Sequence, residues 1–229
     1  MVQVRLASNL LGANELLARK NRNNFSRLGL LAVNLMSSPG SGKTTILEKS
    51  IEYLEGKLTL GVIEGDLYTD QDAQRIEQKG VQVVQINTAG ACHLDAGMVG
   101  KAFEDLPNKE LDLLFIENVG NLVCPAEFDL GEDFKTVVIS TTEGNDKPLK
   151  YPLIFREARV ILLNKIDLLP YTDFSLERFR EDLAQLNPSA PIFLISGRSG
   201  EGIAEWNEWL LGEVRRKVSS YQKLVLDEG

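Results

Sequence analysis

Residues 37–45 read Ser37-Ser38-Pro39-Gly40-Ser41-Gly42-Lys43-Thr44-Thr45, and they are the most informative part of the sequence about its fold. It follows an apolar run over residues 30–36 and passes into a helical pattern over residues 43–55. A strand, a glycine-rich loop and a helix in this order are the context that a phosphate-binding loop requires. The glycines let backbone N–H groups surround phosphate oxygens, and the helix N-terminus adds positive potential. The sequence therefore predicts a nucleotide phosphate site at this loop.

The side chains of the loop have separate expected roles. Lys43 is expected to reach the β and γ phosphates, and the Thr44 hydroxyl is expected to bind Mg²⁺. Ser37 stands where the usual motif begins with glycine, but a short polar residue can adopt the same turn and Gly40 supplies flexibility beside it. We predict that the nucleotide-binding residues of this loop are Ser38, Pro39, Gly40, Ser41, Gly42, Lys43, Thr44 and Thr45.

Strand and helix patterns alternate along the rest of the chain. Apolar runs predict strands near residues 59–64, 81–86, 111–117, 136–140, 158–163 and 191–195. Helical patterns lie near residues 70–79, 94–105, 149–156, 174–185 and 201–217. Apolar strands that alternate with helices indicate a parallel sheet covered on both faces. We predict an α/β fold, a three-layer P-loop NTPase with a mostly parallel central sheet flanked by helices, plus an N-terminal helix.

The composition narrows the class of protein. With 25% charged and 43% hydrophobic residues, the chain of 229 residues is neither a disordered tail nor a membrane span. No apolar run approaches the roughly 18 residues that cross a bilayer, and Arg5, Glu15 and Arg19 interrupt the first helix, so it does not resemble a signal peptide. A net charge of −8 argues against a nucleic-acid partner. Two cysteines cannot form a disulfide framework, so we expect free thiols and a cytoplasmic location.

A second motif indicates which base the nucleotide carries. Residues 164–167 read Asn164-Lys165-Ile166-Asp167 and match the N-K-x-D signature that reads guanine. An Asp carboxylate accepts from the guanine N1–H and N2 amino group together, and adenine offers no such pair of donors. Asn164 is expected to position the loop, and the Lys165 stem to lie over the base. Ser196-Gly197-Arg198 resembles the loop that faces the guanine oxygen. We therefore predict that the nucleotide is GTP.

We divide the chain into a helical extension over residues 1–28 and a P-loop GTPase domain over residues 29–229.

Two acidic residues at the ends of predicted strands are expected to lie near the phosphates. Asp66 follows the strand that ends in Glu64-Gly65, and Glu117 begins Glu117-Asn118-Val119-Gly120, which looks like a D-x-x-G loop with Glu in place of Asp. We predict that Thr44, Asp66 and Glu117 hold Mg²⁺ and that the Gly120 N–H lies near the γ phosphate. The predicted catalytic residues are Lys43, Asp66 and Glu117. Because no glutamine that could position water follows Gly120, we expect slow intrinsic hydrolysis.

The order and wording of these motifs resemble one family, the hydrogenase nickel-insertion GTPases of HypB type, within the signal-recognition and nitrogenase-iron-protein class. The resemblance runs from about Asn21 to the C-terminus and is carried by residues 34–45, Glu64-Gly65-Asp66, Cys92-His93-Leu94-Asp95-Ala96, residues 117–125, Lys147-Pro148-Leu149-Lys150-Tyr151-Pro152 and residues 164–167.

The resemblance implies a metallochaperone that hydrolyses GTP and delivers nickel into the hydrogenase precursor. Cys92, His93 and Cys124 match the metal site of the family's GTPase domain, which binds nickel or zinc at or near a dimer interface. The implied partners are a second copy of the chain, the hydrogenase large-subunit precursor and a companion nickel-maturation protein. The chain has no histidine-rich stretch and no cysteine-rich N-terminal motif. A nickel storage role is therefore not expected.

The residues themselves support a metal site. His93 is the only histidine, it follows Cys92, and Cys124 is the only other cysteine. The three follow predicted strands, so they share one rim of the sheet with the phosphate loop. Two thiolates and one imidazole are fewer than the four ligands of a closed zinc site, so a second chain would complete the site. We expect GTP to move residues 118–125 and so to change metal affinity or dimerisation.

Three alternatives remain at this stage. A urease-type nickel-insertion GTPase shares the class, but its motif has proline between Cys and His. A GTPase switch without a metal role would use both cysteines as core residues. A kinase of similar loop architecture would act on a small molecule and bind ATP as well as GTP. The leucines of the first helix, Leu10, Leu11, Leu16 and Leu17, suggest either packing on its own domain or a docking element for partners.

Overall fold

A single parallel sheet forms the centre of the molecule in the computed structural model, which describes residues 6–65 and 79–227. Seven strands pair in the order β3-β2-β4-β1-β5-β6-β7, and every neighbouring pair is parallel. This confirms the predicted fold class. The strands are β1 (Leu31–Ser37), β2 (Leu60–Glu64), β3 (Gln82–Gln85), β4 (Leu113–Gly120), β5 (Phe134–Ser140), β6 (Ala158–Asn164) and β7 (Ile192–Leu194).

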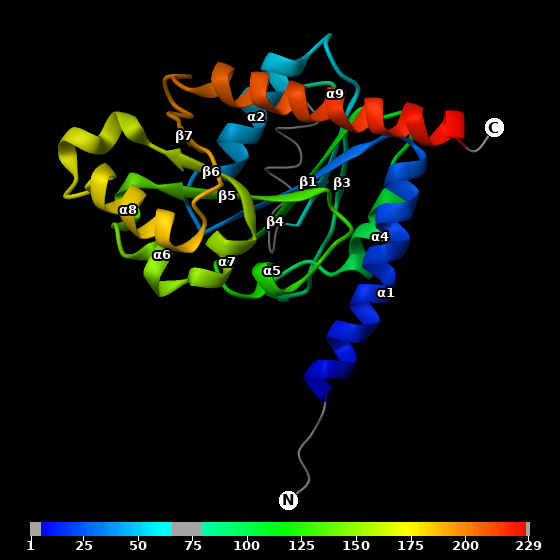
Figure 1. Ribbon diagram of the computed structural model, residues 1–229, viewed down its shortest axis with the longest axis horizontal. Coiled ribbons are helices and arrows are strands. Elements are labelled where there is room, and N and C mark those ends of the chain that lie inside the picture. Colours follow the sequence, from blue (N-terminus) through cyan, green and yellow to red (C-terminus); the bar gives the residue numbers. More distant parts are fainter. Residues whose placement is uncertain (1–5, 66–78, 228–229) are drawn as a thin grey trace, which may run out of the picture.

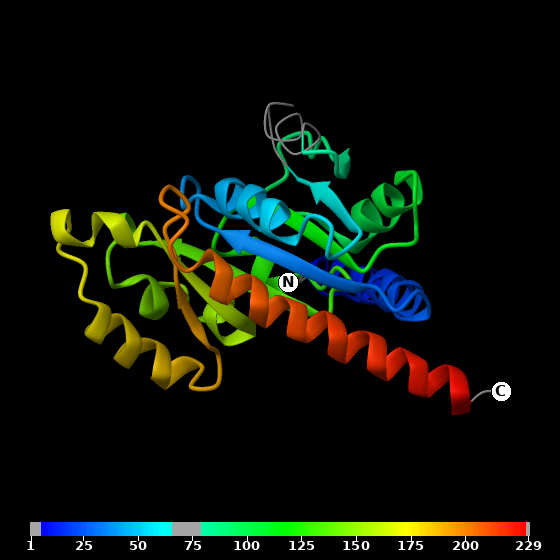
Figure 2. The same ribbon diagram turned by 90° about the horizontal axis from the view of Figure 1, so that it is seen from above.

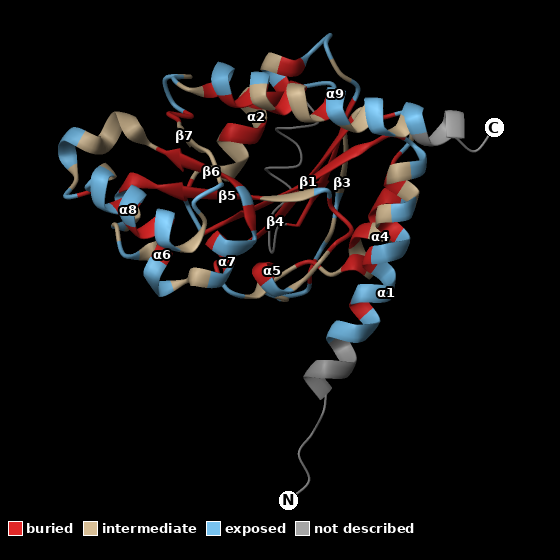
Figure 3. Cartoon of the chain, viewed as in Figure 1, coloured by how far each residue is buried: buried red, intermediate tan, exposed pale blue. Residues whose placement is uncertain are grey.

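The central strands are buried on both faces because their apolar residues do not alternate with polar ones. All seven residues of β1 are buried, and so are the first seven residues of β4 (Figure 3). Such strands require a layer of helices on each side. The chain supplies these layers between successive strands, where a parallel connection needs a crossover.

Helices cover the two faces of the sheet in separate groups. On one face lie α2 (Lys43–Leu54) and α9 (Ile203–Asp227) (Figures 1 and 2). They enclose a core that includes Trp206. The other face carries the helices α1 (Leu6–Arg27), α4 (Ala96–Asp105), α7 (Pro152–Glu157) and α8 (Leu176–Leu186). Short segments complete the chain: α5 (Cys124–Glu127), α6 (Lys147–Lys150) and the 3₁₀ helices η1 (Thr141–Glu143) and η2 (Ile166–Tyr171).

Some predicted helices differ from the observed ones. The helix predicted over residues 149–156 is two short helices, because Pro152 begins α7 and the residue before it, Tyr151, has non-helical backbone angles. The last helix runs ten residues beyond the predicted end, from 217 to 227. The short helix α5 was not predicted. The predicted helix near residues 70–79 falls almost entirely outside the described residues.

The C-terminal half of α1 packs onto the body of the molecule. Phe25 meets Phe103 of α4 edge to face, with ring centroids 5.0 Å apart. The buried Asn21 donates to the carbonyls of Ala96 and Leu130 at 2.7 and 2.9 Å. This half of α1 therefore packs on the chain's own domain. Leu11, Leu16 and Leu17 are exposed, and the side chain of Leu10 lies outside the described residues. None of the helices in the described ranges is long and apolar enough to cross a lipid bilayer.

Candidate functional site

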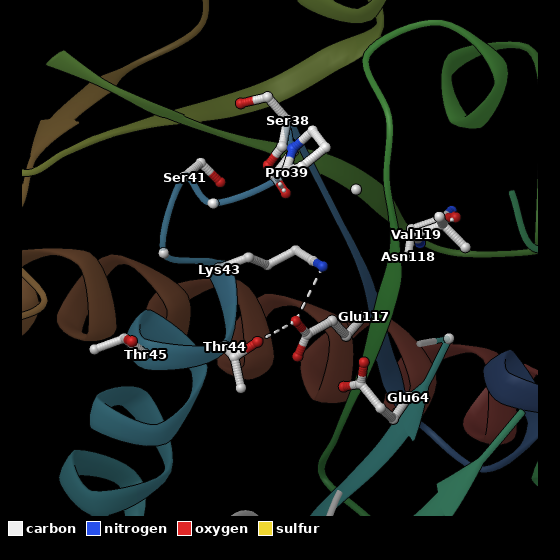
Figure 4. Close-up of a pocket in the computed structure, with 15 residues that line it drawn as sticks. Ser38, Pro39, Ser41, Lys43, Thr44, Thr45, Glu64, Glu117, Asn118 and Val119 are labelled. Atoms are coloured by element: carbon white, nitrogen blue, oxygen red, sulfur yellow. Dashed lines mark hydrogen bonds and ion pairs between the residues drawn. The ribbon is translucent and has the colours of Figure 1, made fainter. Parts of the chain in front are cut away.

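The phosphate loop wraps a cavity at the carboxyl ends of the strands. Gly40 and Gly42 have φ of +72° and +93°, values that side chains rarely tolerate. The cavity has a volume of about 410 Å³ (Figure 4). Its lining comprises residues 37–45, Glu64, Gly65 and residues 117–120. The eight loop residues predicted to bind nucleotide, together with Glu117 and Gly120, therefore share one hollow.

Glu117 stands at the centre of the polar contacts in this cavity. Its Oε1 lies 3.0 Å from Lys43 Nζ and accepts a hydrogen bond of 2.8 Å from Thr44 Oγ1 (Figure 4). The side chain is only 1% exposed. Burial acts to raise the pKa of Glu117, but the positive charge of Lys43 and three side-chain hydrogen bonds outweigh it. The pKa therefore lies below the ordinary value of 4.5, and the carboxyl group is ionised at neutral pH.

The predicted base-reading motif contacts the phosphate loop directly. Asn164 Nδ2 donates to the Ser41 carbonyl at 2.8 Å, and Lys165 Nζ donates to the Gly40 carbonyl at 2.7 Å. A Cβ atom on Gly42 would lie 2.3 Å from Asn164 Nδ2, so this close approach requires glycine. Lys165 has a left-handed backbone, with φ of +60°. The phosphate loop and the base loop are thus built as one unit.

The third predicted loop completes this unit. Gly197 N donates to Asn164 Oδ1 at 3.0 Å, and Ser196 Oγ donates to Asp167 Oδ1 at 2.7 Å. Asn164 therefore holds both the phosphate loop and the 196–198 loop through its single amide group. Arg198 is exposed at the rim. Asp66 is a predicted catalytic and magnesium residue that lies outside the described residues.

Contacts that the sequence analysis did not predict support the same loops. Glu143 Oε1 accepts from Ser140 N at 2.9 Å, and its Oε2 accepts a short hydrogen bond from Ser38 Oγ. Thr141 Oγ1 donates to the Lys165 carbonyl at 2.8 Å, next to the left-handed turn. Ser140 and Glu143 form a capping box at the start of η1. The spacing of a serine and a glutamate three residues later was the available signal.

The three predicted transition-metal ligands converge. One ligand atom from each of Cys92, His93 and Cys124 lies within 4.8 Å of the other two. Cys92 Sγ is 3.4 Å from His93 Nδ1, and the His93 ring stacks on Phe128 at a centroid distance of 3.8 Å. Two sulfur atoms and an imidazole nitrogen form a donor set that suits nickel, zinc or copper.

The protonation states of His93 and Cys124 act in opposite directions on metal binding at neutral pH. Burial lowers the pKa of His93 from its ordinary value of 6.5, against the attraction of Asp95 and Glu127, so the imidazole is neutral and can act as a ligand. The pKa of the Cys124 thiol is raised, mainly by its hydrogen bond with Cys92 and to a smaller extent by burial. A metal that binds here must therefore displace a thiol proton.

One segment connects the metal cluster to the phosphate cavity. Residues 117–120 line the cavity, and Cys124 belongs to the cluster. Between them, Asn121 Nδ2 donates to the Cys92 carbonyl at 3.3 Å, and Asn121 Oδ1 accepts from Val123 N at 2.9 Å. The segment over residues 117–124 is therefore in contact with both sites.

Comparisons with known proteins agree with this architecture. A family model described as CobW/HypB/UreG, nucleotide-binding domain, matches residues 31–194. Hydrogenase maturation factor HypB of Azotobacter chroococcum mcd 1 is 54% identical over 207 residues, which cover 90% of this chain and 68% of that protein.

Solved structures give the same result. The crystal structure of HypB from Helicobacter pylori in complex with nickel aligns with a TM-score of 0.85 at 40% identity, over 90% of this chain and 97% of that one. Signal recognition particle 54 kDa protein from Aeropyrum pernix K1, in complex with GDP, aligns with a TM-score of 0.55 at 15% identity, over 85% and 49% of the two chains. The second likeness shows the fold alone. The chain therefore belongs to the CobW/HypB/UreG family of nucleotide-binding proteins, and within it to the hydrogenase maturation factors of HypB type.

Proposed function

We propose that this chain is a GTP-hydrolysing metallochaperone that delivers nickel into the hydrogenase precursor, with its nucleotide state coupled to metal binding and dimerisation. The observation that carries the proposal is the segment over residues 117–124. Its first residue, Glu117, contacts Lys43 and Thr44, and its last, Cys124, lies beside Cys92 and His93. A change at the phosphates thus has a short covalent path to the metal ligands.

GTP is the proposed nucleotide, and the base loops support it. Asp167 presents a carboxylate that matches the two donors on the guanine edge. Asn164 and Lys165 contact the phosphate loop, so the base site is held at a fixed distance from the phosphate cavity. We propose that Gly120 contacts the γ phosphate, and that Ser196, Gly197 and Arg198 lie beside the base.

Magnesium fits the oxygen donors of the cavity. The Thr44 hydroxyl and the Glu117 carboxylate are hard oxygen ligands of the kind that Mg²⁺ prefers, and we propose Asp66 as a third. When bound, Mg²⁺ would neutralise charge on the phosphate oxygens. Lys43, 3.0 Å from Glu117, would be available to the phosphates when that carboxylate holds the ion. No glutamine follows Gly120 closely, so we propose a slow intrinsic rate of hydrolysis.

Nickel is the proposed cargo, and zinc is a competitor for the same ligands. The Helicobacter pylori relative was solved in complex with nickel. In this chain, Cys92, His93 and Cys124 give three donors, which leaves room for a ligand from a second copy or from the receiving protein. An incomplete site allows transfer, because the metal can exchange ligands without leaving all of them at once.

The proposed partners follow from the family. They are a second copy of this chain, the hydrogenase large-subunit precursor and a companion nickel-maturation protein. The Azotobacter chroococcum relative is a hydrogenase maturation factor, which favours this function over the urease-type alternative. Two free cysteines suit a reducing compartment such as the cytoplasm.

The test is a nickel titration combined with size-exclusion chromatography, in GDP and in a non-hydrolysable GTP analogue. Wild type should bind nickel stoichiometrically, and its affinity and dimer fraction should differ between the two nucleotides. Cys92→Ala and Cys124→Ala should each lose nickel binding and keep GTP binding. Ser219→Ala, on the exposed face of α9, serves as a matched surface control. A wild type that does not bind nickel would leave a GTPase switch without a metal role, and nickel binding that survives both cysteine substitutions would contradict the proposed ligands.

A further inference from the structure

A chain of buried hydrogen bonds runs from the metal segment into the sheet. The Leu94 N–H donates to Asn118 Oδ1 at 3.1 Å, and Asn118 Nδ2 donates to Asn34 Oδ1 at 3.3 Å. Asn34 Nδ2 then donates to Glu132 Oε1 at 3.2 Å. All four residues are buried, with at most 5% of their surface exposed. Leu94 directly follows His93, so the chain begins next to the metal ligands.

The polarity of this chain fixes the orientation of the Asn118 amide. Glu132 Oε2 accepts from Leu130 N at 2.6 Å, so the carboxyl group is anchored and presents Oε1 as an acceptor to Asn34. Asn34 must therefore turn its NH₂ group towards Glu132 and its oxygen towards Asn118. Asn118 in turn must point its own oxygen at the N–H groups of Leu94 and Val119. A flipped amide would place donors against donors in a buried site, which is costly.

Asn118 also stands directly next to the residue that contacts the phosphate loop. Successive side chains of a strand point to opposite faces. Glu117 therefore reaches Lys43 and Thr44 (Figure 4). Asn118 reaches the Leu94 backbone instead. Because the two residues are adjacent, a movement of the β4 backbone at Glu117 also moves Asn118. The contact with the phosphate loop and the contact with the metal segment are thus made by adjacent residues.

The Leu94 side chain gives a second contact between the same regions. A Cβ atom on Gly65 would lie 2.9 Å from Leu94 Cγ, so glycine is needed where β2 ends against this leucine. Gly65 N donates to the Glu117 carbonyl at 2.9 Å. Leu94 is therefore held through its backbone by Asn118 and through its side chain by the end of β2. Both neighbours lie at the phosphate cavity.

We infer that Asn118, oriented by Asn34 and Glu132, is the positioning residue that links the nucleotide site to the Cys92–His93 segment. The inference rests on the proposed coupling of GTP to metal binding and names the side chain that carries it. The side-chain amide of Asn118 makes its hydrogen bonds to Leu94, Val119 and Asn34. Its amide transfers a displacement of β4 to Leu94 and so to the ligands that precede it in the chain.

The test compares nickel dissociation constants in GDP and in a non-hydrolysable GTP analogue, by titration of the full chain. We expect wild type to show a ratio of at least about fivefold. Asn118→Ala should reduce that ratio to below about twofold, while nickel affinity without nucleotide stays within about threefold of wild type. Asn207→Ala removes a buried asparagine of α9 on the opposite face of the sheet and should keep the wild-type ratio.

The outcomes separate this inference from the proposed function. A wild-type ratio of one overturns the coupling and the inference with it. A wild-type ratio above fivefold that Asn118→Ala retains overturns the inference alone. If Asn118→Ala loses nickel affinity equally in every nucleotide state, Asn118 only supports the structure of the metal site, and this result also overturns the inference.

A measurement on the wild type covers the case in which Asn118→Ala does not fold. Amide hydrogen exchange at Leu94 reports the hydrogen bond to Asn118 without any substitution. We expect its protection to differ by about tenfold or more between GDP and the GTP analogue. Equal protection in the two states would mean that this hydrogen bond does not respond to nucleotide, and would overturn the inference.

Discussion

The Lys43–Glu117 pair makes the stability of the fold depend on pH. Because the folded pKa of Glu117 lies below 4.5, its ionised form stabilises the folded state above that pH, and the stabilisation is lost as the pH falls through the folded pKa. We expect Glu117→Gln to show a shallower loss of unfolding free energy between pH 6 and acid than wild type. Urea unfolding across that range measures it. Glu52→Gln, at an exposed ion pair, is the control and should change the free energy by about 0.5 kcal/mol or less.

Base specificity is a second property that one residue decides. Asp167→Asn replaces one carboxylate oxygen by an NH₂ group, which complements the N1–H and O2 of xanthine and repels the N2 amino group of guanine. We expect GTP affinity to fall by about 100-fold and xanthosine triphosphate to bind in its place. Competition binding with GTP, xanthosine triphosphate and ATP checks this. Asp173→Asn, at an exposed carboxylate six residues on, should leave the preference unchanged, and comparable ATP and GTP binding by wild type would favour the kinase alternative.

Residues of motifs with a fixed spacing lie together in the structure, whereas partners distant in sequence were not predicted. Asn164 contacts the phosphate loop, Asp167 contacts Ser196, and Cys92, His93 and Cys124 converge. The roles of these residues remain predictions. Asn34 could have been noticed as a polar residue inside an apolar strand, because such a buried amide needs partners. Its partners, Asn118 and Glu132, lie 84 and 98 positions away, and no local pattern identifies them.

The attachment of α1 depends on glycines that let elements approach closely. Gly131 has φ of +90°, and a Cβ atom there would lie 2.6 Å from the Ala18 carbonyl of α1. Gly131→Ala should therefore lower the free energy of unfolding by about 1–3 kcal/mol. Gly12 lies in the exposed part of the same helix with open space around its Cβ, so Gly12→Ala should raise it by about 0.5–1 kcal/mol. Urea unfolding of both variants tests the pair, and a stable Gly131→Ala variant would show that α1 can move away at little cost.

Element boundaries were less predictable than the elements themselves. Apolar runs located all seven strands to within a few residues, because buried parallel strands are apolar throughout. The helix predicted over residues 149–156 was wrong as one element, since Pro152 interrupts the helical hydrogen bonding and sets Tyr151 outside it. The four-residue helix α5 is too short to produce a periodic signal, although it carries Cys124 at its start.

The arrangement of the whole molecule followed only in part from the sequence. Alternating strands and helices predicted a parallel sheet with its loops on one rim, and the sheet has that form. The alternation does not give the order of strands. The order β2-β4-β1 sets the end of β4 between the end of β2 and the phosphate loop, which brings residues 117–124 to both sites. This adjacency comes from long-range pairing, which local patterns do not encode.

Reciprocal linkage gives the prediction for the assembled molecule. If a second chain completes the Cys92, His93 and Cys124 site, nickel must strengthen the dimer by the same factor by which dimerisation strengthens nickel binding. Sedimentation equilibrium of the chain with a GTP analogue should show a dimer dissociation constant that falls by about fivefold or more when nickel is added. Cys92→Ala should keep the effect of nucleotide on the dimer and lose the effect of nickel, because its phosphate cavity is unchanged. A dimer constant that does not respond to nickel in the wild type would mean that each chain binds its metal alone.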